Sequence, residues 1–237
     1  SDGETTSPML ALSHDAWLAI GLSFKVSLVA TLAALPVATL FALILARGNF
    51  PGKALFDGII HLPLVLPPVV TGYALLLLMG RKGVIGAFLD RTFGIVFAFR
   101  WTGAALAAAV MAMPIIVRAI RLSIEAVDRR LEQASGTLGA GPVVTFFLVT
   151  LPLSLPGILV GGTLGFAKAL GEFGATITFV SNIPGETRTI ASAIYTASQS
   201  PDGDAEALIL SGIAVAIGLG ALIVSELMAR WFRRSAT

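Results

Sequence analysis

Cysteine is absent from this 237-residue chain, and histidine occurs only twice. Without cysteine, neither a disulfide framework nor a thiolate metal site can form, and two histidines far apart in the sequence are a poor basis for a zinc or haem site. Charged residues are scarce too, at 13% of the chain, whereas soluble domains carry about 25%. These shortages exclude a disulfide-rich secreted domain and argue against a soluble one.

Nucleotide-binding and catalytic motifs are missing as well. The nearest match to a phosphate-binding P-loop, "GNFPGKA" from Gly48, is one residue short and has alanine where serine or threonine would hold magnesium. No Ser/His, paired-aspartate or metal constellation favours an intramembrane enzyme, and no chain of carboxylates and histidines favours a proton-coupled pump. We therefore expect no cofactor in this chain, and any uphill transport would draw on an ion gradient or on a separate ATPase.

Long apolar stretches are what the chain has in abundance, since 56% of its residues are hydrophobic. Five of these stretches are long enough to cross a bilayer of about 30 Å as helices. They run from Ala16 to Ala46, Ile59 to Met79, Thr102 to Leu122, Pro152 to Leu170 and Ala207 to Ala229. We predict an all-α membrane protein with about five transmembrane helices, whose termini lie on opposite sides of the membrane.

The loop cations predict the orientation, because cytoplasmic loops carry an excess of lysine and arginine. With the N-terminus outside, the inner set is Arg47, Lys53, Arg118, Arg121, Arg129, Arg130, Arg230, Arg233 and Arg234, and the outer set is Arg81, Lys82, Arg91, Arg100 and Arg188. The inner set is the larger, which favours the N-terminus outside and the C-terminus inside. On this reading the loop between the third and fourth spans faces the cytoplasm.

Prolines interrupt the apolar stretches, and three of them fall in "HLPLVLPPVV" at the start of the second span. Each proline removes a backbone donor, and a membrane tolerates the freed carbonyl only where protein or water satisfies it. Proline is also welcome in the first turn of a helix. Pro67 and Pro68 are thus either an ordinary helix start or part of a cavity wall or hinge.

Small residues recur every four positions in two spans. Gly157, Gly161, Gly165 and Ala169 share one face of the fourth span, and the fifth span repeats the device from Gly212 to Gly220. Small residues let membrane helices approach closely. These faces predict packing within the chain or, alternatively, contact with a second subunit or a moving pore wall.

The outer end of the fourth span carries an ionisable pair. Lys168 and Glu172 are four residues apart and can touch. Lys168 lies about 24 Å along the helix from Pro152, near the outer interface, where it either extends its amine to the headgroups or lines the mouth of a pathway. The polar segment from Ser181 to Asp204 is predicted to lie outside, with a short helix from Ile190 to Ala197, whereas the segment 171–180 is too short for a sixth span.

Between the third and fourth spans, "SIEAVDRRLEQASGTLGAG" has the period of an amphipathic helix. Its apolar positions are Ile124, Val127, Leu131, Ala134 and Leu138. Gly139, Gly141 and Pro142 should end it. A membrane-surface anchor would have bulky apolar residues on one face, whereas this segment has small ones from Leu131 onward. It suits insertion into a groove on another protein.

This loop resembles the signature of ABC importer permeases, in which Glu-Ala-Ala is followed by three residues, Gly, nine residues and Ile-x-Leu-Pro. Glutamine stands here in place of the glutamate, and Glu132 directly precedes it as a possible substitute. The resemblance implies a type I permease domain over residues 16–230, with a cytoplasmic coupling loop over about 123–151. A polar segment, 1–15, precedes this domain and a basic cytoplasmic tail, 231–237, follows it. The implied ATPase-coupling residues are Glu132, Gln133, Ala134, Ser135, Leu138, Gly139, Leu151 and Pro152.

Longer blocks are similar to the permeases of molybdate ABC importers, from about Leu22 to Arg230. They include "FPGKALFDGIIHLPLVLPPVVTGY", "TLPLSLPGI" and "ALGEFGATITFVSNIPGETRTI". "LGEFGA" is shared with sulfate and thiosulfate permeases, so sulfate, thiosulfate and tungstate are alternatives to molybdate. The resemblance implies a bacterial cytoplasmic-membrane protein that forms a pathway with a second copy of itself. Its other implied partners are two cytoplasmic ATPase subunits that bind ATP and magnesium, an external oxyanion-binding protein and membrane lipid, but no nucleic acid.

A dianion must bind weakly enough to leave, which favours hydroxyls and backbone donors over fixed charges along the pathway. We place four such residues, Thr176, Thr178, Ser181 and Asn182, on the outer end of the fourth helix. The full set of pathway or gate candidates is Pro67, Pro68, Lys168, Glu172, Thr176, Thr178, Ser181 and Asn182. An ion-driven secondary transporter is the alternative function, and it would need no ATPase.

Overall fold

The computed structural model describes residues 12–235, and every regular element in that range is a helix. The elements are α1 (His14–Arg47), α2 (Lys53–Val65), α3 (Pro68–Met79), α4 (Val84–Phe93), α5 (Trp101–Ala126), α6 (Arg129–Thr137), α7 (Pro142–Thr145), the π-helical η1 (Phe146–Thr150), α8 (Leu151–Leu170), α9 (Gly174–Val180), α10 (Ile190–Ser198) and α11 (Asp204–Ser235). The predicted all-α class is confirmed.

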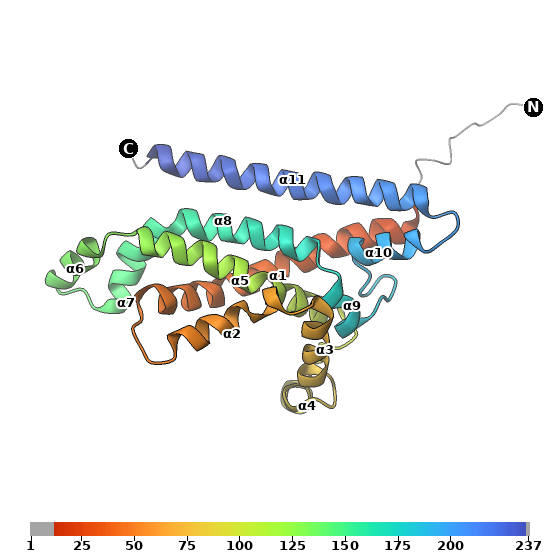
Figure 1. Ribbon diagram of the computed structural model, residues 1–237, viewed down its shortest axis with the longest axis horizontal. Coiled ribbons are helices and arrows are strands. Elements are labelled where there is room, and N and C mark those ends of the chain that lie inside the picture. The colour runs from red at the N-terminus through yellow and green to blue at the C-terminus, as the bar shows by residue number, and fades with distance from the viewer. Residues whose placement is uncertain (1–11, 236–237) are drawn as a thin grey trace, which may run out of the picture.

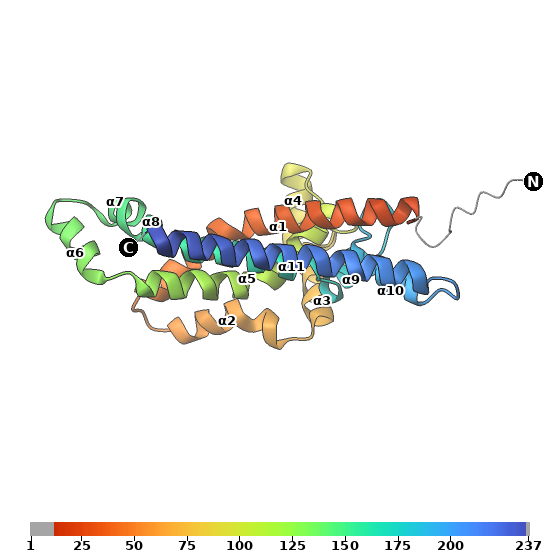
Figure 2. The same ribbon diagram turned by 90° about the horizontal axis from the view of Figure 1, so that it is seen from above.

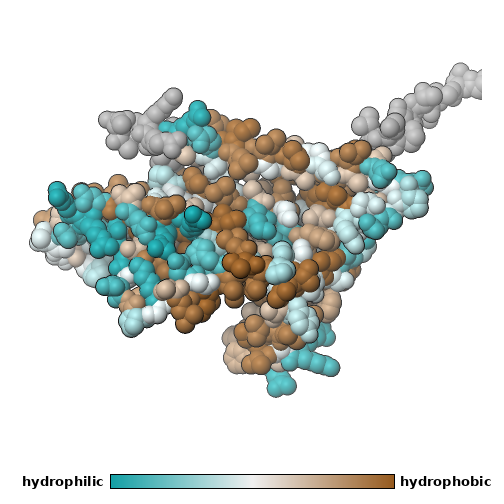
Figure 3. Space-filling model, in the orientation of Figure 1, coloured by the Kyte–Doolittle hydropathy of each residue, from teal (hydrophilic) through white to brown (hydrophobic). Residues whose placement is uncertain are grey.

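Four long helices, α1, α5, α8 and α11, run along the length of the molecule (Figures 1 and 2). One end of this bundle carries α6 and α7, and the other carries α10; we call them the α6 end and the α10 end. α1 begins at the α10 end, and α11 finishes at the α6 end. In the space-filling view, hydrophobic side chains cover the middle of the molecule, and hydrophilic ones gather mainly around the α6 end (Figure 3).

Small residues form the core of the bundle. α5 lies between α1 and α8, and its Ala104, Ala107 and Ala108 are completely buried. A Cβ added to Gly157 of α8 would lie 2.2 Å from the Ser123 side chain, and one at Gly165 would lie 2.5 Å from the Ile116 side chain. The small-residue face of α8 therefore packs within the chain, as close helix approach in a membrane requires.

The small-residue face of α11 differs. A Cβ added to Gly212 or Gly220 would meet nothing within 4 Å among the described residues. Only 6% of the most apolar window of this helix is buried inside the chain. Of the two readings of these faces, intrachain packing thus describes α8 but not these two glycines of α11.

Four helical segments are long and apolar enough to cross a membrane: His14–Arg47, Trp101–Ala126, Pro142–Leu170 and Asp204–Arg230. A fifth crossing exists if α2 and α3 count as one span, but these two helices meet at a bend of 114°. The stretch from Ile59 to Met79 is thus broken at the prolines, where irregular backbone was expected. Pro67 and Pro68 lack the N–H groups that would bond to the carbonyls of Pro63 and Leu64, so the helix cannot continue through them.

The expected amphipathic helix between the third and fourth spans starts later than its hydrophobic period suggested. Ile124 is fully buried and belongs to α5, which ends at Ala126. Asp128 then begins α6, because its side chain accepts the N–H of Arg130 at 2.9 Å as an N-cap. At the other end the prediction is confirmed: α6 finishes at Thr137, and Gly139 follows with a left-handed φ of +89°.

The fourth span also ends as a helix before its expected outer residues. α8 stops at Leu170, and the seven-residue α9 follows after a turn. Thr176 and Thr178 therefore lie on α9 and not on the outer end of the fourth helix, and Ser181 and Asn182 come after α9. The short helix expected from Ile190 to Ala197 is confirmed as α10.

The outer boundaries of the expected domain fall partly outside the described residues. Residues 1–11 of the expected polar segment and residues 236–237 of the expected tail lie there. α1 already begins at His14, and α11 continues as a helix through most of the expected tail to Ser235.

Candidate coupling helix and transport pathway

α6 is held at one end of the bundle without a single buried residue of its own. Glu132 and Ser135, three positions apart and so on one face of the helix, are partly covered. Gln133 and Ala134 are exposed, and 88% of the surface of Leu138 is exposed. The helix therefore has one face turned to the protein and another that offers polar and apolar groups to the outside.

Glu132 connects α6 to two other elements, α1 and η1. Arg47, in the last turn of α1, donates from Nε and Nη2 to Glu132 Oε1 at 3.2 and 3.1 Å. The same Nη2 donates to the carbonyl of Val127, between α5 and α6, at 3.0 Å. The hydroxyl of Thr150, which is buried in η1, donates to Glu132 Oε1 at 2.7 Å. We call Arg47, Glu132 and Thr150 the clasp.

The clasp decides which of two adjacent side chains faces outward. Both carboxylate oxygens of Glu132 lie within 3.2 Å of Arg47, so this side chain is engaged with its own chain. Gln133, which occupies the family's glutamate position, is the exposed one. Glu132 itself faces the bundle, and its substitution for that glutamate stays a prediction.

The remaining coupling candidates surround the clasp. Ser135 lies 3.1 Å from the hydroxyl of Thr145 in α7, which ties α6 to the returning chain. Gly139 takes its left-handed conformation with open space where a Cβ would be. Leu151 and Pro152 begin α8 directly after η1. A π-helical turn such as η1 is rare, and such turns are frequent at functional sites.

At the far end of α8, Lys168 and Glu172 form the expected pair. Lys168 Nζ donates to Glu172 Oε2 at 2.7 Å, and Glu172 Oε1 accepts the N–H of Ala175 at 3.0 Å. Only 2% of the Glu172 side chain is exposed, against 29% of the Lys168 side chain. The pair thus fixes the turn between α8 and α9 from inside the protein.

The broken second span packs against this turn. A Cβ on Gly174 would lie 2.7 Å from Pro68, and one on Gly72 would lie 2.4 Å from the carbonyl oxygen of Ala175. Thr176 is buried, and its hydroxyl donates to the Phe173 carbonyl at 2.8 Å. The structure therefore brings the start of α3 together with α9.

Of the other three hydroxyl or amide candidates, Thr178 and Asn182 have side chains that are bonded within the chain. Thr178 donates to the carbonyl of Gly174 at 2.8 Å. Ser181 has a φ of +66° and accepts, through its carbonyl, the hydroxyl of Thr187. Asn182 lies with the α10 region, bonded to Thr196 at 2.8 Å and to Arg188 at 3.1 Å. Asn182 thus bonds toward α10, whereas Ser181 caps α9.

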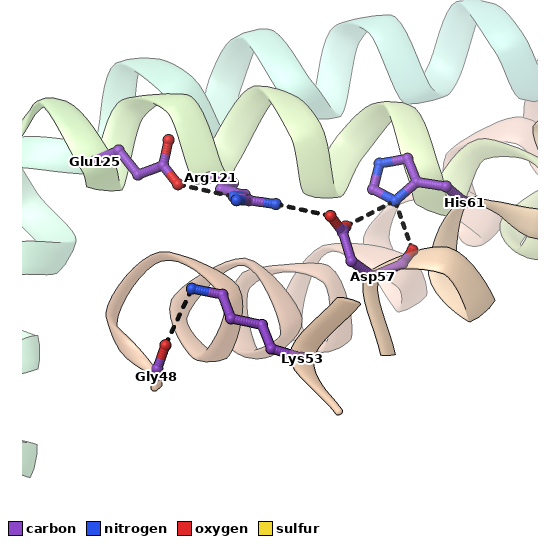
Figure 4. A network of polar contacts seen from close by, with 6 residues as sticks. All are labelled: Gly48, Lys53, Asp57, His61, Arg121 and Glu125. Atoms are coloured by element: carbon purple, nitrogen blue, oxygen red, sulfur yellow. Dashed lines mark hydrogen bonds and ion pairs between the residues drawn. The ribbon is translucent and has the colours of Figure 1, made fainter. Parts of the chain in front are cut away.

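Sequence reasoning missed a polar network between α2 and α5 (Figure 4). Arg121 lies between Asp57 at 3.1 Å and Glu125 at 2.8 Å, and His61 Nδ1 is 3.0 Å from the second Asp57 oxygen. Arg118 lies one turn earlier on α5. Both arginines fall inside the stretch expected to span from Thr102 to Leu122, and an ionisable residue inside a span is a functional candidate by default. No group of metal-ligating side chains occurs among the residues that the structure describes.

Apolar spans packed on small residues, with a short helix held outside the bundle by polar contacts, define a multi-pass membrane protein. Residues 38–236 match the family described as the binding-protein-dependent transport system inner membrane component. The chain belongs to this family, and it is a multi-pass inner membrane permease.

Proteins similar in sequence or structure match this chain over 90% or more of its length. The molybdenum transport system permease protein ModB of Escherichia coli strain K12 is 58% identical over 227 residues, covering 96% of this chain and 99% of that protein. ModB of Haemophilus influenzae is 54% identical over 212 residues, covering 90% and 93%. The inward-facing MetNI methionine ABC transporter has the same fold, with a TM-score of 0.65 at 16% identity over 94% of this chain and 96% of that one. The expected ABC importer permease is confirmed.

Proposed function

We propose that this chain is the membrane-spanning subunit of an ATP-driven importer of molybdate. The names of the E. coli and H. influenzae relatives support this cargo. Tungstate has nearly the same size and charge, and sulfate and thiosulfate share the tetrahedral shape, so these anions are the competitors. Two copies of the chain form the pathway, and an external binding protein delivers the anion.

ATP hydrolysis belongs to two partner subunits, because this chain has no complete P-loop. We place the α6 end on the cytoplasmic side, in agreement with the excess of loop cations expected there. The N-terminus then lies outside and the C-terminus inside. The partner ATPases bind ATP and magnesium beneath the α6 ends of the two copies.

The exposed face of α6 is the observation that supports coupling most directly. Leu131 is 49% exposed and Leu138 88% exposed on a helix that is otherwise polar. Exposed leucines beside Gln133 and Ala134 suit a cleft on the ATPase, where their burial contributes binding free energy.

The opposite face of α6 provides the route for motion. When ATP closes the ATPase pair and displaces α6, the clasp carries the displacement to α1 through Arg47 and to η1 and α8 through Thr150. Arg47 also donates to the carbonyl of Val127, which caps the end of α5. The displacement therefore reaches α1, α5 and α8 together. Such coupling acts through two arrangements of a packed assembly.

Uptake by the reconstituted complex tests this function. In proteoliposomes containing the permease, its ATPase and its binding protein, labelled molybdate should accumulate only with ATP, and an excess of sulfate should compete weakly. Uptake that survives ATP depletion but collapses with an uncoupler would instead identify an ion-driven secondary transporter. Stronger competition by sulfate than by unlabelled molybdate would reassign the cargo.

A further inference from the structure

Arg118 is a cation without a partner on a membrane-crossing helix. It lies eight residues before the last residue of α5, about 12 Å along the helix axis from the α6 end. Its side chain is exposed, and it makes no hydrogen bond or ion pair with any residue that the structure describes. Arginines at such depth normally face water or protein and mark ion or substrate pathways.

Two cavities meet at this side chain. One, of about 570 Å³, is almost wholly apolar and is lined by residues of α2, α5, α8 and α11, among them Leu64, Pro114 and Pro156. The other, of about 320 Å³, is lined by five ionisable residues and Leu122. Arg118 and Leu122 belong to the walls of both. Arg118 therefore stands where an apolar space opens into a polar one.

The other four ionisable residues of the polar cavity contact one another. Arg121 is held between Asp57 and Glu125 (Figure 4). His61 Nδ1 is 2.9 Å from the backbone carbonyl oxygen of Asp57 and 3.0 Å from the second carboxylate oxygen, which has no hydrogen-bond partner of its own. Both carboxylates thus face the guanidinium of Arg121, which reduces their repulsion toward an incoming anion. Arg118 is the one ionisable residue of this cavity that has no hydrogen bond or ion pair with the described residues.

We propose that Arg118 binds the tetrahedral oxyanion cargo near the cytoplasmic end of the pathway; this inference rests on the proposed function. The guanidinium fork matches the geometry of two oxygens on one tetrahedral anion. A single arginine, with carboxylates close by, binds a dianion weakly enough to release it, as conduction requires. The volume of the polar cavity, about 320 Å³, leaves room for one such ion beside Arg118. The headgroup phosphate of a lipid has the same chemistry, and the experiment must separate the two.

The test uses the nucleotide-free complex of permease and ATPase, purified in a detergent without phosphate groups. Equilibrium binding of radiolabelled molybdate is measured for the wild type, Arg118→Gln, Arg118→Lys and Arg91→Gln. Arg91 is a matched control, because it is exposed on α4, has no ion pair among the described residues and lines neither cavity. Native mass spectrometry counts phosphatidylglycerol molecules retained by the same four proteins.

We expect Arg118→Gln to raise the dissociation constant for molybdate about tenfold, Arg118→Lys to raise it less, and Arg91→Gln to leave it unchanged. Equal phosphatidylglycerol retention by all four would complete this result. Unchanged molybdate binding by Arg118→Gln would overturn the site, and so would loss of lipid without loss of molybdate binding.

Co-purification of the ATPase with each variant shows that the permease has folded. The wild-type complex separates failure of this site from failure of the proposed function. If wild-type proteoliposomes import molybdate with ATP while the nucleotide-free complex binds no oxyanion, only the Arg118 site is wrong. If Arg118→Gln lowers binding of sulfate but the wild type imports no molybdate, the site stands and the proposed cargo is wrong.

Discussion

Two carboxylates lie at opposite ends of the continuous helix formed by η1 and α8, and each is paired with one cation. Glu172, at the α10 end, is 2% exposed and bonds to Lys168 only four residues away. Glu132, at the α6 end, is 19% exposed and bonds to Arg47, which is 85 residues away. The first pair closes a local turn, whereas the second connects separate elements.

Because Glu172 is more deeply buried than Glu132, breaking its ion pair should cost more free energy. Removing one partner of a buried ion pair leaves a charge that the interior does not solvate, and the penalty is several kcal/mol. At a partly exposed pair, water takes over part of the lost interaction. The Lys168–Glu172 pair is therefore the costlier of the two to break, and under the proposed function the clasp is the contact that transport would displace.

The largest effect should come from Lys168→Met. This change leaves the buried Glu172 with only the N–H of Ala175, so we expect the free energy of unfolding to fall by about 2–3 kcal/mol. Thermal unfolding of the purified permease in detergent measures it. The double variant Lys168→Met, Glu172→Gln should recover most of the loss, because no unpaired charge remains. A melting temperature equal to that of the wild type would show that this pair is not the rigid one.

Breaking the clasp should lower the free energy of unfolding less than Lys168→Met does, but it should weaken the coupling of ATP hydrolysis to import more. Glu132→Gln removes the negative charge that Arg47 and Thr150 share, and we expect a loss of about 1 kcal/mol in the free energy of unfolding. The number of ATP molecules hydrolysed per molybdate imported should rise several-fold, because displacement of α6 reaches α1 and α8 less completely.

A double-mutant cycle with Arg47→Met controls this result. The two changes together should raise the number of ATP molecules hydrolysed per molybdate by less than the sum of their separate effects, since each breaks the same contact. Additive effects would mean that Arg47 and Glu132 act independently, which would contradict the role of their contact in transmitting the motion of α6.

The smallest effect on stability should come from the exposed face of α6. Leu138→Ala removes a side chain that touches little of its own chain, so the free energy of unfolding should change by less than about 0.5 kcal/mol. Retention of the ATPase during purification should nevertheless fall, because the leucine would be buried in the partner. Full retention of the ATPase by this variant would remove Leu138 from the proposed interface. Leu148→Ala, at another exposed leucine near the same end, is the matched control.

Much of the coupling site follows from the sequence, but its internal connections do not. The spacing from Gln133 to Pro152 predicts a helix, a turn at Gly139 and a following apolar helix, and the structure has all three. Arg47 carries no such local signal, because its partner is distant in the sequence. Arg118 and Arg121 on α5 do carry a local signal, because they are charges inside a span.

By itself the sequence determined that this protein is a bundle of membrane-crossing helices, because a long apolar segment in lipid must satisfy its backbone internally. It also determined that the second span breaks, since adjacent prolines lack the donors of a helix. Only the tertiary structure decided which of Glu132 and Gln133 faces the protein. Adjacent side chains on a helix point about 100° apart, so only one of the two can face the bundle. Glu132 is that one because it bonds to Arg47 and Thr150, which belong to distant segments of the chain.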